Sequence, residues 1–156
     1  RFSYRDSRLR ERPSPQITVL RIQMLLKPRE AKAIYDEARD YQRQRISKQP
    51  PPASAGSFFK NVNDHALAQT ISNLPARLRE AGVIPAGFLL EHAGMAGFRV
   101  GGAMLAPRHA NFVLNAQRAS ATDIRNLARA AIASVQEKFG VTLEEEVLYL
   151  GNWPTL

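Results

Sequence analysis

The chain has 156 residues, 44% of them hydrophobic and 23% charged, which is typical of one globular domain or of one domain with a piece of another. It has no cysteine, so disulfides, thiolate metal sites and cysteine nucleophiles are excluded, and a cytoplasmic location is expected. No apolar run approaches the roughly 18 residues that a membrane-spanning helix needs. The net charge of +8 predicts an anionic partner such as nucleic acid, lipid or a phosphorylated small molecule.

The segment before residue 53 is predicted to hold one strand and one helix. Residues 2–6 are typical of the end of a structured element, and the charged, proline-containing residues 7–16 are typical of a loop. Ile17–Leu26 is β-branched and partly alternating, which predicts a strand. Pro28 begins a predicted helix that fades over residues 43–48. The apolar face of this helix comprises Ala31, Ile34, Tyr35, Ala38 and Tyr41.

Three prolines at positions 50–52 interrupt the chain, and we expect a domain boundary between residues 52 and 53. The chain begins at Arg1 without a methionine, so we also expect that a part upstream of it is missing.

The stretch Ala55–Asn61 follows, and it has two interpretations. Two small residues, a hydroxyl, two aromatic rings, a cation and an amide suit a segment that lies against a ligand, where small residues let the backbone pass close by. The same residues also suit the start of a strand with two phenylalanines in the core. In the first interpretation Phe58 and Phe59 would anchor the segment, one on each side.

The rest of the chain is predicted to hold three helices and three strands. Asn63 or Asp64 is predicted to cap a helix through Leu74, and a short helix over residues 85–93 is predicted to stop at Gly94. Residues 98–105 are predicted to form a strand that Gly101-Gly102 lets press against a neighbour. Further strands are predicted at 111–115 and 146–150, on either side of a long helix that begins at a Ser120-x-x-Asp123 capping pattern and ends at Gly140. The long helix has an apolar face of Ile124, Leu127, Ala128, Ala131, Val135 and Phe139.

This pattern predicts an α+β fold, in which a two-layer mixed sheet carries helices packed on it. Common catalytic motifs are absent: residues 97–103 lack the spacing of a dinucleotide fingerprint, and there is no phosphate-binding G-x-x-x-x-G-K. The three histidines lack a metal-ligand spacing, so no metal site is expected.

Six short motifs taken together are more specific than any of them alone. They are Tyr-Arg-Asp-Ser at 4–7, Ala-Gly-Ser-Phe-Phe-Lys-Asn at 55–61, Ala-Gly-Phe-Leu-Leu-Glu at 86–91, Gly-Gly-Ala at 101–103, His-Ala-Asn-Phe-Val-Leu-Asn at 109–115 and Leu-Glu-Glu-Glu-Val at 143–147. In this order they resemble the UDP-N-acetylenolpyruvoylglucosamine reductases, the MurB family of flavoenzymes in peptidoglycan synthesis. The resemblance implies that residues 1–52 are the tail of an FAD-binding domain and residues 53–156 a substrate-binding domain.

The resemblance also implies a reaction in two halves. NADPH reduces FAD, and hydride is then added to C3 of UDP-N-acetylglucosamine enolpyruvate while C2 is protonated to give UDP-N-acetylmuramate. Ser57 matches the family's proton donor, Glu146 its second acid or proton relay, and Arg5 the arginine that meets the substrate carboxylate. If these residues have only structural roles, Ser57 caps a turn after Gly56, Arg5 forms a surface ion pair with Asp6, and the glutamates form a solvated turn. If Glu146 is the buried acid, Glu144 and Glu145 are expected to be solvated.

The resemblance extends to binding positions. Asn61, His109 and Lys48 match substrate contacts, and Arg45 and Gly56 match positions near the flavin. His109 could equally be structural, and Lys48 and Arg45 could simply favour a helix end. Two positions depart from the family pattern: Val62 stands where proline is usual, and Ala96 where lysine is usual.

A different class of function remains open on the residues alone. The chain could be a non-catalytic module of the same fold that uses its positive charge to bind nucleic acid. Its aromatic residues do not interleave with the basic ones as a stacking platform requires, so no nucleic-acid partner is expected.

Overall fold

The structure is a computed structural model that describes residues 2–3, 6–10, 17–48, 50 and 52–153, without the side chains of residues 2, 3, 6, 10 and 48. The chain divides into two compact units, Arg1–Asp40 and Tyr41–Leu156. None of the helices in the described ranges is long and apolar enough to cross a membrane.

The first unit contains little regular structure before its helix. Strand β1 (Phe2–Ser3) pairs antiparallel with β2 (Asp6–Ser7), and a 3-10 turn, η1 (Arg8–Arg10), follows. The strand predicted over residues 17–26 is wrong, because this segment has no regular secondary structure and no strand pairing. Its apolar side chains are exposed, with Leu20 at 90% and Leu25 at 100%. A β-branched sequence forms a strand only where another strand satisfies its backbone groups, and none of the described residues provides one here.

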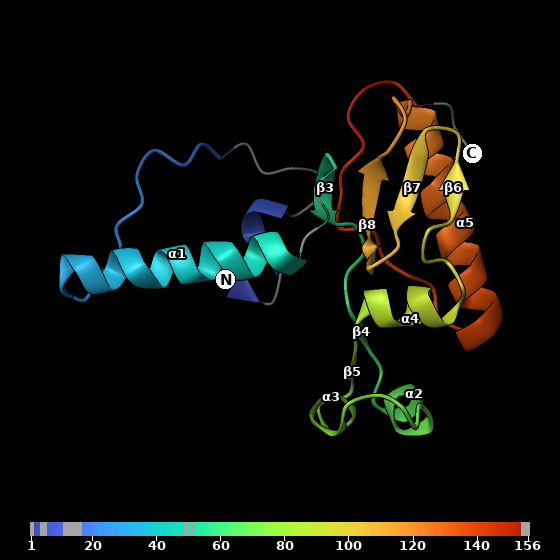
Figure 1. Ribbon diagram of the computed structural model, residues 1–156, viewed down its shortest axis with the longest axis horizontal. Helices are drawn as coiled ribbons and strands as arrows, with labels where there is room; N and C mark the ends of the chain where they lie inside the picture. The colour runs from blue at the N-terminus through green and yellow to red at the C-terminus, as the bar shows by residue number, and fades with distance from the viewer. Residues whose placement is uncertain (1, 4–5, 11–16, 49, 51, 154–156) are drawn as a thin grey trace. The chain divides into compact units, whose positions relative to one another are not determined.

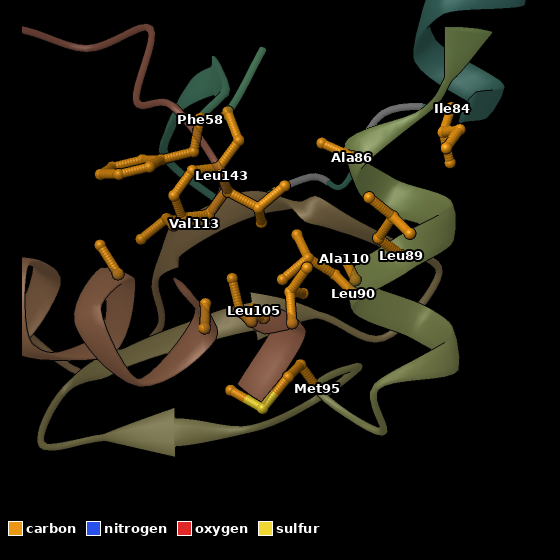
Figure 2. Close-up of a cluster of buried hydrophobic side chains, with 14 of the residues drawn as sticks. Phe58, Ile84, Ala86, Leu89, Leu90, Met95, Leu105, Ala110, Val113 and Leu143 are labelled. Atoms are coloured by element: carbon orange, nitrogen blue, oxygen red, sulfur yellow. The ribbon is translucent and has the colours of Figure 1, made fainter. Parts of the chain in front are cut away.

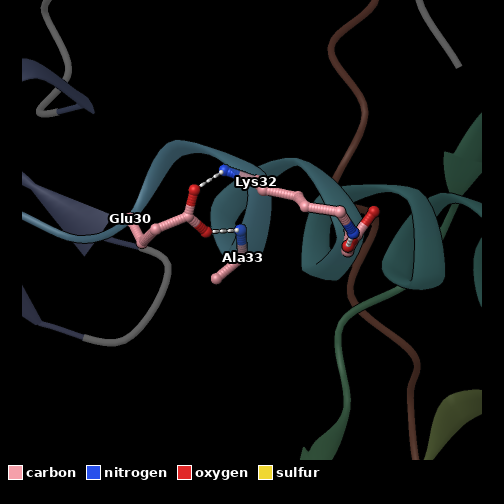
Figure 3. A network of polar contacts seen from close by, with 4 residues as sticks. Glu30, Lys32 and Ala33 are labelled. Carbon is pink, nitrogen blue, oxygen red and sulfur yellow. Dashed lines mark hydrogen bonds and ion pairs between the residues drawn. The ribbon is translucent and has the colours of Figure 1, made fainter.

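At the N-terminus of helix α1 (Ala31–Lys48), the side chain of the preceding residue, Glu30, caps free backbone N–H groups. The Glu30 carboxylate accepts hydrogen bonds from the backbone N–H of Lys32 at 2.8 Å and of Ala33 at 2.6 Å, as Figure 3 shows. The helix therefore starts three residues after Pro28, and it continues through the segment in which it was predicted to fade. Ile34, Tyr35 and Tyr41 on its predicted apolar face are exposed.

The second unit is built on a four-stranded sheet in the order β3 (Ser54–Ser57), β8 (His109–Asn115), β7 (Ala103–Ala106) and β6 (Arg99–Val100). Each of these strands pairs antiparallel with its neighbour, so the sheet expected to be mixed is antiparallel in the structure. Helices α4 (Ala86–His92) and α5 (Ala121–Phe139) lie beside it in Figure 1. The predicted α+β class, with helices packed on a sheet, is confirmed.

The core lies between the sheet and these two helices. Leu105 and Val113 from the sheet pack with Leu89 of α4 and Val135 of α5, and Figure 2 shows part of this cluster. The opposite face of the sheet carries a smaller cluster of Ala106, Phe112, Leu114 and Met104. Alternate residues of β7 thus serve the two faces, with Ala103 and Leu105 in the larger cluster and Met104 and Ala106 in the smaller one.

The single strand predicted over residues 98–105 is wrong, because Gly101-Gly102 forms a turn between β6 and β7. Gly101 has a φ of +53°, which favours glycine. A Cβ on Gly102 would lie 2.4 Å from the carbonyl oxygen of Gln117, so the predicted close approach of backbones at this glycine is confirmed. The two glycines therefore make a hairpin rather than a straight strand.

A small lobe joins β3 to α4. It holds β4 (Val62–Asn63), which pairs with β5 (Val83–Ile84), and the helices α2 (His65–Thr70) and α3 (Ala76–Glu80). Asp64 caps α2 as predicted, with its carboxylate accepting from Leu67 N–H at 2.9 Å. The helix predicted to reach Leu74 instead ends at Thr70, and α3 begins after Pro75.

The ends of α5 follow local rules and are confirmed. Ser120 and Asp123 form the predicted capping box, and Gly140 ends the helix in the left-handed conformation. The Asp123 carboxylate also accepts a hydrogen bond from Gly102 N–H at 3.3 Å, which ties the helix to the β6–β7 turn. The final strand predicted over residues 146–150 is wrong, because none of these residues is in a strand. An isolated bridge to Phe59 is formed by Glu145, directly before them.

We predict that Asp123→Asn lowers the thermal unfolding midpoint by a few degrees at pH 7 and that this difference narrows below about pH 4. Hydrogen bonds from Ser120 and Gly102 lower the pKa of Asp123 below its ordinary value of 3.8. A carboxyl with a lowered pKa in the folded state stabilises the fold above that ordinary value and loses the effect as the pH falls through the folded pKa. The measurement is a series of thermal melts from pH 7 to pH 3.

Glu137→Gln is the matched control for this prediction, because it removes the same charge from an exposed position of the same helix. A midpoint difference for Asp123→Asn that stays constant down to pH 3 would contradict the role of the ionised carboxylate.

Candidate functional site

The stretch Ala55–Asn61 is a strand end that enters the core and leaves it again. Ser57 is the last residue of β3 and is exposed, whereas Phe58 and Phe59 are 3% and 1% exposed. Their rings contact each other edge to face with centroids 5.1 Å apart, in one hydrophobic cluster. The expectation that they anchor opposite sides is therefore wrong, and the core-phenylalanine interpretation holds alongside an exposed hydroxyl.

The side chain of Asn111 holds this segment against the sheet. Its Oδ1 accepts from Phe59 N–H at 2.9 Å, and its Nδ2 donates to Phe59 C=O at 2.9 Å. The Asn111 backbone carbonyl accepts from Phe58 N–H at 2.8 Å. Asn111 is 4% exposed, so its amide satisfies two backbone groups that water does not reach. The sequence predicted that Asn111 lies in a strand but did not predict this role. No sequence pattern reveals that an asparagine side chain pairs with the backbone of a residue 52 positions away.

Residues 144–146 lie on the other side of the phenylalanines. Lys60 N–H donates to Glu144 C=O at 2.9 Å, and Glu146 N–H donates to Phe58 C=O at 2.8 Å. Phe58 directly follows Ser57, so these bonds bring the backbones of Ser57 and Glu146 close together. The two predicted acids, which are 89 positions apart in the sequence, come from neighbouring segments, and Glu146 is half-buried.

Glu144 is exposed, as expected, whereas Glu145 is partly buried, and both have partners. Glu144 forms an ion pair with Lys60. Glu145 accepts a hydrogen bond at 2.8 Å from the Tyr149 hydroxyl. Each of them thus helps to attach the segment that carries Glu146.

Asn61 and His109 both reach the first residues of α4. The Asn61 Oδ1 accepts from Ala86 N–H at 3.3 Å. The His109 ring packs against Phe112, with ring centroids 4.7 Å apart, and a Cβ on Gly87 would lie 3.3 Å from it. Its Nδ1 is buried and has no hydrogen-bond partner among the described residues, so one ring nitrogen has unused hydrogen-bonding capacity.

Two of the remaining predicted site residues, Gly56 and Arg45, lie within the described part of the chain with their side chains. Gly56 has a φ of +86°, and a Cβ there would meet nothing within 4 Å, so the structure shows a conformational need for glycine and open space beside it. Arg45 is exposed on α1, and no hydrogen bond or ion pair from its side chain occurs among the described residues. The whole of Arg5 and the side chain of Lys48 lie outside the described residues.

The two departures from the family pattern occupy ordinary positions. Val62 is paired with Ile84 in the β4–β5 ladder and packs against the core. Ala96 is exposed in the turn after α4. Among the described residues, no three histidine, aspartate or glutamate side chains come together as a metal site.

Comparison with known proteins agrees with this arrangement. A family model described as the C-terminal domain of UDP-N-acetylenolpyruvoylglucosamine reductase matches residues 46–150. The chain belongs to this family. It is 37% identical over 99% of its length to the reductase of Caldicellulosiruptor bescii and 36% identical over 97% to that of Synechococcus sp. strain JA-3-3Ab.

The structural comparison points the same way. The crystal structure of the MurB reductase from Thermus caldophilus matches 77% of the chain with a TM-score of 0.51 and 32% identity, and the match covers 35% of that chain. The chain spans 43% and 42% of the lengths of the Caldicellulosiruptor and Synechococcus relatives, so the family assignment concerns less than half of each relative.

We predict that Asn111→Ala lowers the free energy of unfolding by about 2–4 kcal/mol, because each buried backbone group left without a partner costs about 1–3 kcal/mol. Asn126→Ala, at an exposed position of α5, is the control. Denaturant unfolding of the two variants measures the difference. Equal stability of both would show that the Phe59 backbone finds other partners.

Proposed function

We propose that this chain is the substrate-binding part of a flavin-dependent reductase that converts UDP-N-acetylglucosamine enolpyruvate to UDP-N-acetylmuramate with NADPH, for peptidoglycan precursor synthesis in the cytoplasm. Residues 1–52 would be the tail of its FAD-binding domain and residues 53–156 the substrate-binding domain. The observation that supports the proposal is the pairing of residues 58–60 with residues 144–146, in which the half-buried Glu146 donates its N–H to the C=O of Phe58, the residue after the exposed Ser57. The names of the relatives support the same reaction.

The proposed chemistry explains why a hydroxyl and a carboxyl belong together here. Hydride addition to C3 of the enol ether leaves negative charge on C2 and on the adjoining carboxylate. Ser57 would donate its proton to C2. A serine hydroxyl is a weak acid, but the enolate is a strong base and can take its proton. Glu146 would return a proton to this site, and Arg5 would stabilise the charge on the carboxylate with two parallel hydrogen bonds.

The substrate would extend from Ser57 toward the start of α4. Asn61 and His109 both reach that helix, and the buried Nδ1 of His109 has no partner among the described residues. Together with Lys48, these side chains provide amide, imidazole and ammonium groups for the sugar and the diphosphate. The net charge of +8 favours such an anionic substrate.

The residues near Ser57 fit a cofactor that lies against the strand end. The space beside Gly56 is open on this chain, and the Ser57 side chain faces solvent. Gly56 would let the ring approach the backbone, and Arg45 would balance the charge of a phosphate. FAD, once reduced by NADPH, supplies the hydride.

We predict that Ser57→Ala slows substrate reduction by about 10²–10⁴-fold in the reductase that includes this chain, while flavin reduction by NADPH stays near the parent rate. The substitution removes the proton donor but little volume, so substrate should still bind. Single-turnover stopped flow in water and in heavy water measures the two half-reactions. Ser57→Cys keeps a proton at the position and should restore part of the rate.

Ser72→Ala, at an exposed position between α2 and α3, is the control for a lost hydroxyl elsewhere. If Ser57→Ala is reoxidised by substrate at the parent rate, the proton comes from another group and the strand end has only a structural role.

We further predict that the chain by itself binds UDP-N-acetylglucosamine enolpyruvate but not FAD or duplex DNA. The described residues carry Asn61 and His109, whereas most flavin contacts of the proposed reductase would lie outside residues 1–156. Calorimetry with each of the three ligands in turn tests this. Binding of DNA without binding of the nucleotide sugar would favour a nucleic-acid module instead.

A further inference from the structure

Beyond the two backbone hydrogen bonds of Glu144 and Glu146, the segment that carries Glu146 is held by side chains. After Leu143, which is buried, the chain forms a single bridge at Glu145 and then has no regular structure through Trp153. A segment with so few backbone bonds opens easily unless side chains attach it to the rest of the domain. The contacts that do so therefore control where Glu146 lies.

A cluster of one cation and two aromatic rings attaches this segment to α5. The Arg125 guanidinium lies over the Tyr149 ring at 5.5 Å and over the Trp153 ring at 5.0 Å from their centroids. The two rings meet edge to face with centroids 5.2 Å apart, and Trp153 Nε1 donates to Leu150 C=O at 3.2 Å. We call Arg125, Tyr149 and Trp153 the α5 clamp. Because a guanidinium attracts the faces of aromatic rings, the clamp joins residues 149–153 to the first turns of the helix.

The clamp is connected to the bridge by one hydrogen bond. The Tyr149 hydroxyl donates to Glu145 Oε1 at 2.8 Å, and Glu145 is the residue that bridges to Phe59. Burial of the phenol raises the pKa of Tyr149, and the bond to the Glu145 carboxylate raises it further, so the hydroxyl keeps its proton at neutral pH. A protonated tyrosine beside a carboxylate makes a charge-assisted bond, which is stronger than a neutral one.

We infer that Tyr149, held by Arg125 and Trp153, is a positioning residue for Glu146. The α5 clamp holds the side chain of Glu145 through Tyr149, and the bridge to Phe59 holds the backbone of Glu145. Glu146, the next residue, donates its N–H to the C=O of Phe58, which directly follows Ser57. The inference rests on the proposed function for the role of Glu146, but the attachment of the segment does not depend on that function.

The attachment is tested first, without any assay of activity. In Tyr149→Phe the ring stays and the hydroxyl is lost, and we expect amide hydrogen exchange in residues 144–147 to become about tenfold faster. This factor corresponds to the loss of one hydrogen bond to a charged group. Arg125→Met should have the same effect, whereas Arg77→Met, on the exposed side of α3, should have none. Unchanged exchange in Tyr149→Phe and Arg125→Met would overturn the inference.

Conservative substitution separates the hydrogen bond from bulk and charge. Glu145→Gln keeps an acceptor oxygen for Tyr149 but loses the charge, so its exchange should lie between that of the parent and that of Glu145→Ala, and Glu145→Ala should resemble Tyr149→Phe. Equal exchange in Glu145→Gln and Glu145→Ala would show that the side-chain bond does not hold the segment.

The positioning role is then tested in the reductase that includes this chain. We expect Tyr149→Phe to slow substrate reduction by about 10- to 10²-fold, as a misplaced catalytic group does, and to leave flavin reduction by NADPH unchanged. The double variant Tyr149→Phe/Glu146→Gln should be no slower than Glu146→Gln alone, because a residue that acts only through Glu146 adds nothing once Glu146 is lost. Additive losses, or a parent rate in Tyr149→Phe, would overturn the inference.

The proposed function fails if the parent protein does not reduce the substrate, and the amide-exchange results do not depend on that outcome. If the parent reduces the substrate and Glu146→Gln does so at the same rate, the proposed role of Glu146 falls, and the positioning role of Tyr149 falls with it. If Glu146→Gln is slow and Tyr149→Phe is not, the function stands and only the positioning role falls.

Discussion

The double hydrogen bond between the Asn111 amide and the Phe59 backbone is the contact on which the candidate site depends. At Ser57 the chain leaves the edge of the four-stranded sheet, and the phenylalanines that follow turn into the core. Their backbone groups would then be buried without a ladder to satisfy them, which is costly. The Asn111 side chain supplies the missing acceptor and donor on one side, and residues 144–146 supply ladder partners on the other. An exposed serine can therefore sit directly beside a fully packed core.

Features of the fold that arise within a few residues could be predicted from the sequence. The capping box of Ser120 and Asp123, the Asp64 cap and the left-handed Gly140 involve neighbours in the chain, so their physics is visible in the pattern. Two of the three wrong strand predictions show the opposite property. Residues 17–26 and 146–150 have suitable compositions but belong to no strand, because no strand partner extends along them in the described part of the chain. Residues 98–105 differ, because the Gly101-Gly102 turn divides them into two strands. Strand formation depends on a partner that composition does not show.

The candidate site shows the same limit at the level of side chains. Order and resemblance made Ser57 and Glu146 candidates, and the structure brings their chain segments together through the bond from Glu146 N–H to Phe58 C=O. Sequence reasoning could not say that Glu144 and Glu145 have partners of their own, because Lys60 is far away in the chain and Tyr149 carries no motif. Nor could it find the α5 clamp, since an arginine and two aromatic residues are common and only their convergence is informative. Local patterns predict residue types, whereas tertiary packing assigns their partners.

The segments that carry Ser57 and Glu146 are attached to the same hydrophobic cluster, so a substitution in this cluster affects both. Phe58 and Phe59, next to Ser57, and Leu143, shortly before Glu146, belong to one hydrophobic cluster with Leu105 and Val113 of the sheet. Protein interiors are close-packed, so a change of volume in this cluster shifts its neighbours instead of being absorbed. A core substitution there would move the serine and glutamate segments relative to each other, although it touches neither polar group. Apolar packing therefore sets the distance between the segments of Ser57 and Glu146, and the backbone hydrogen bonds between residues 58–60 and 144–146 set how the two segments are aligned.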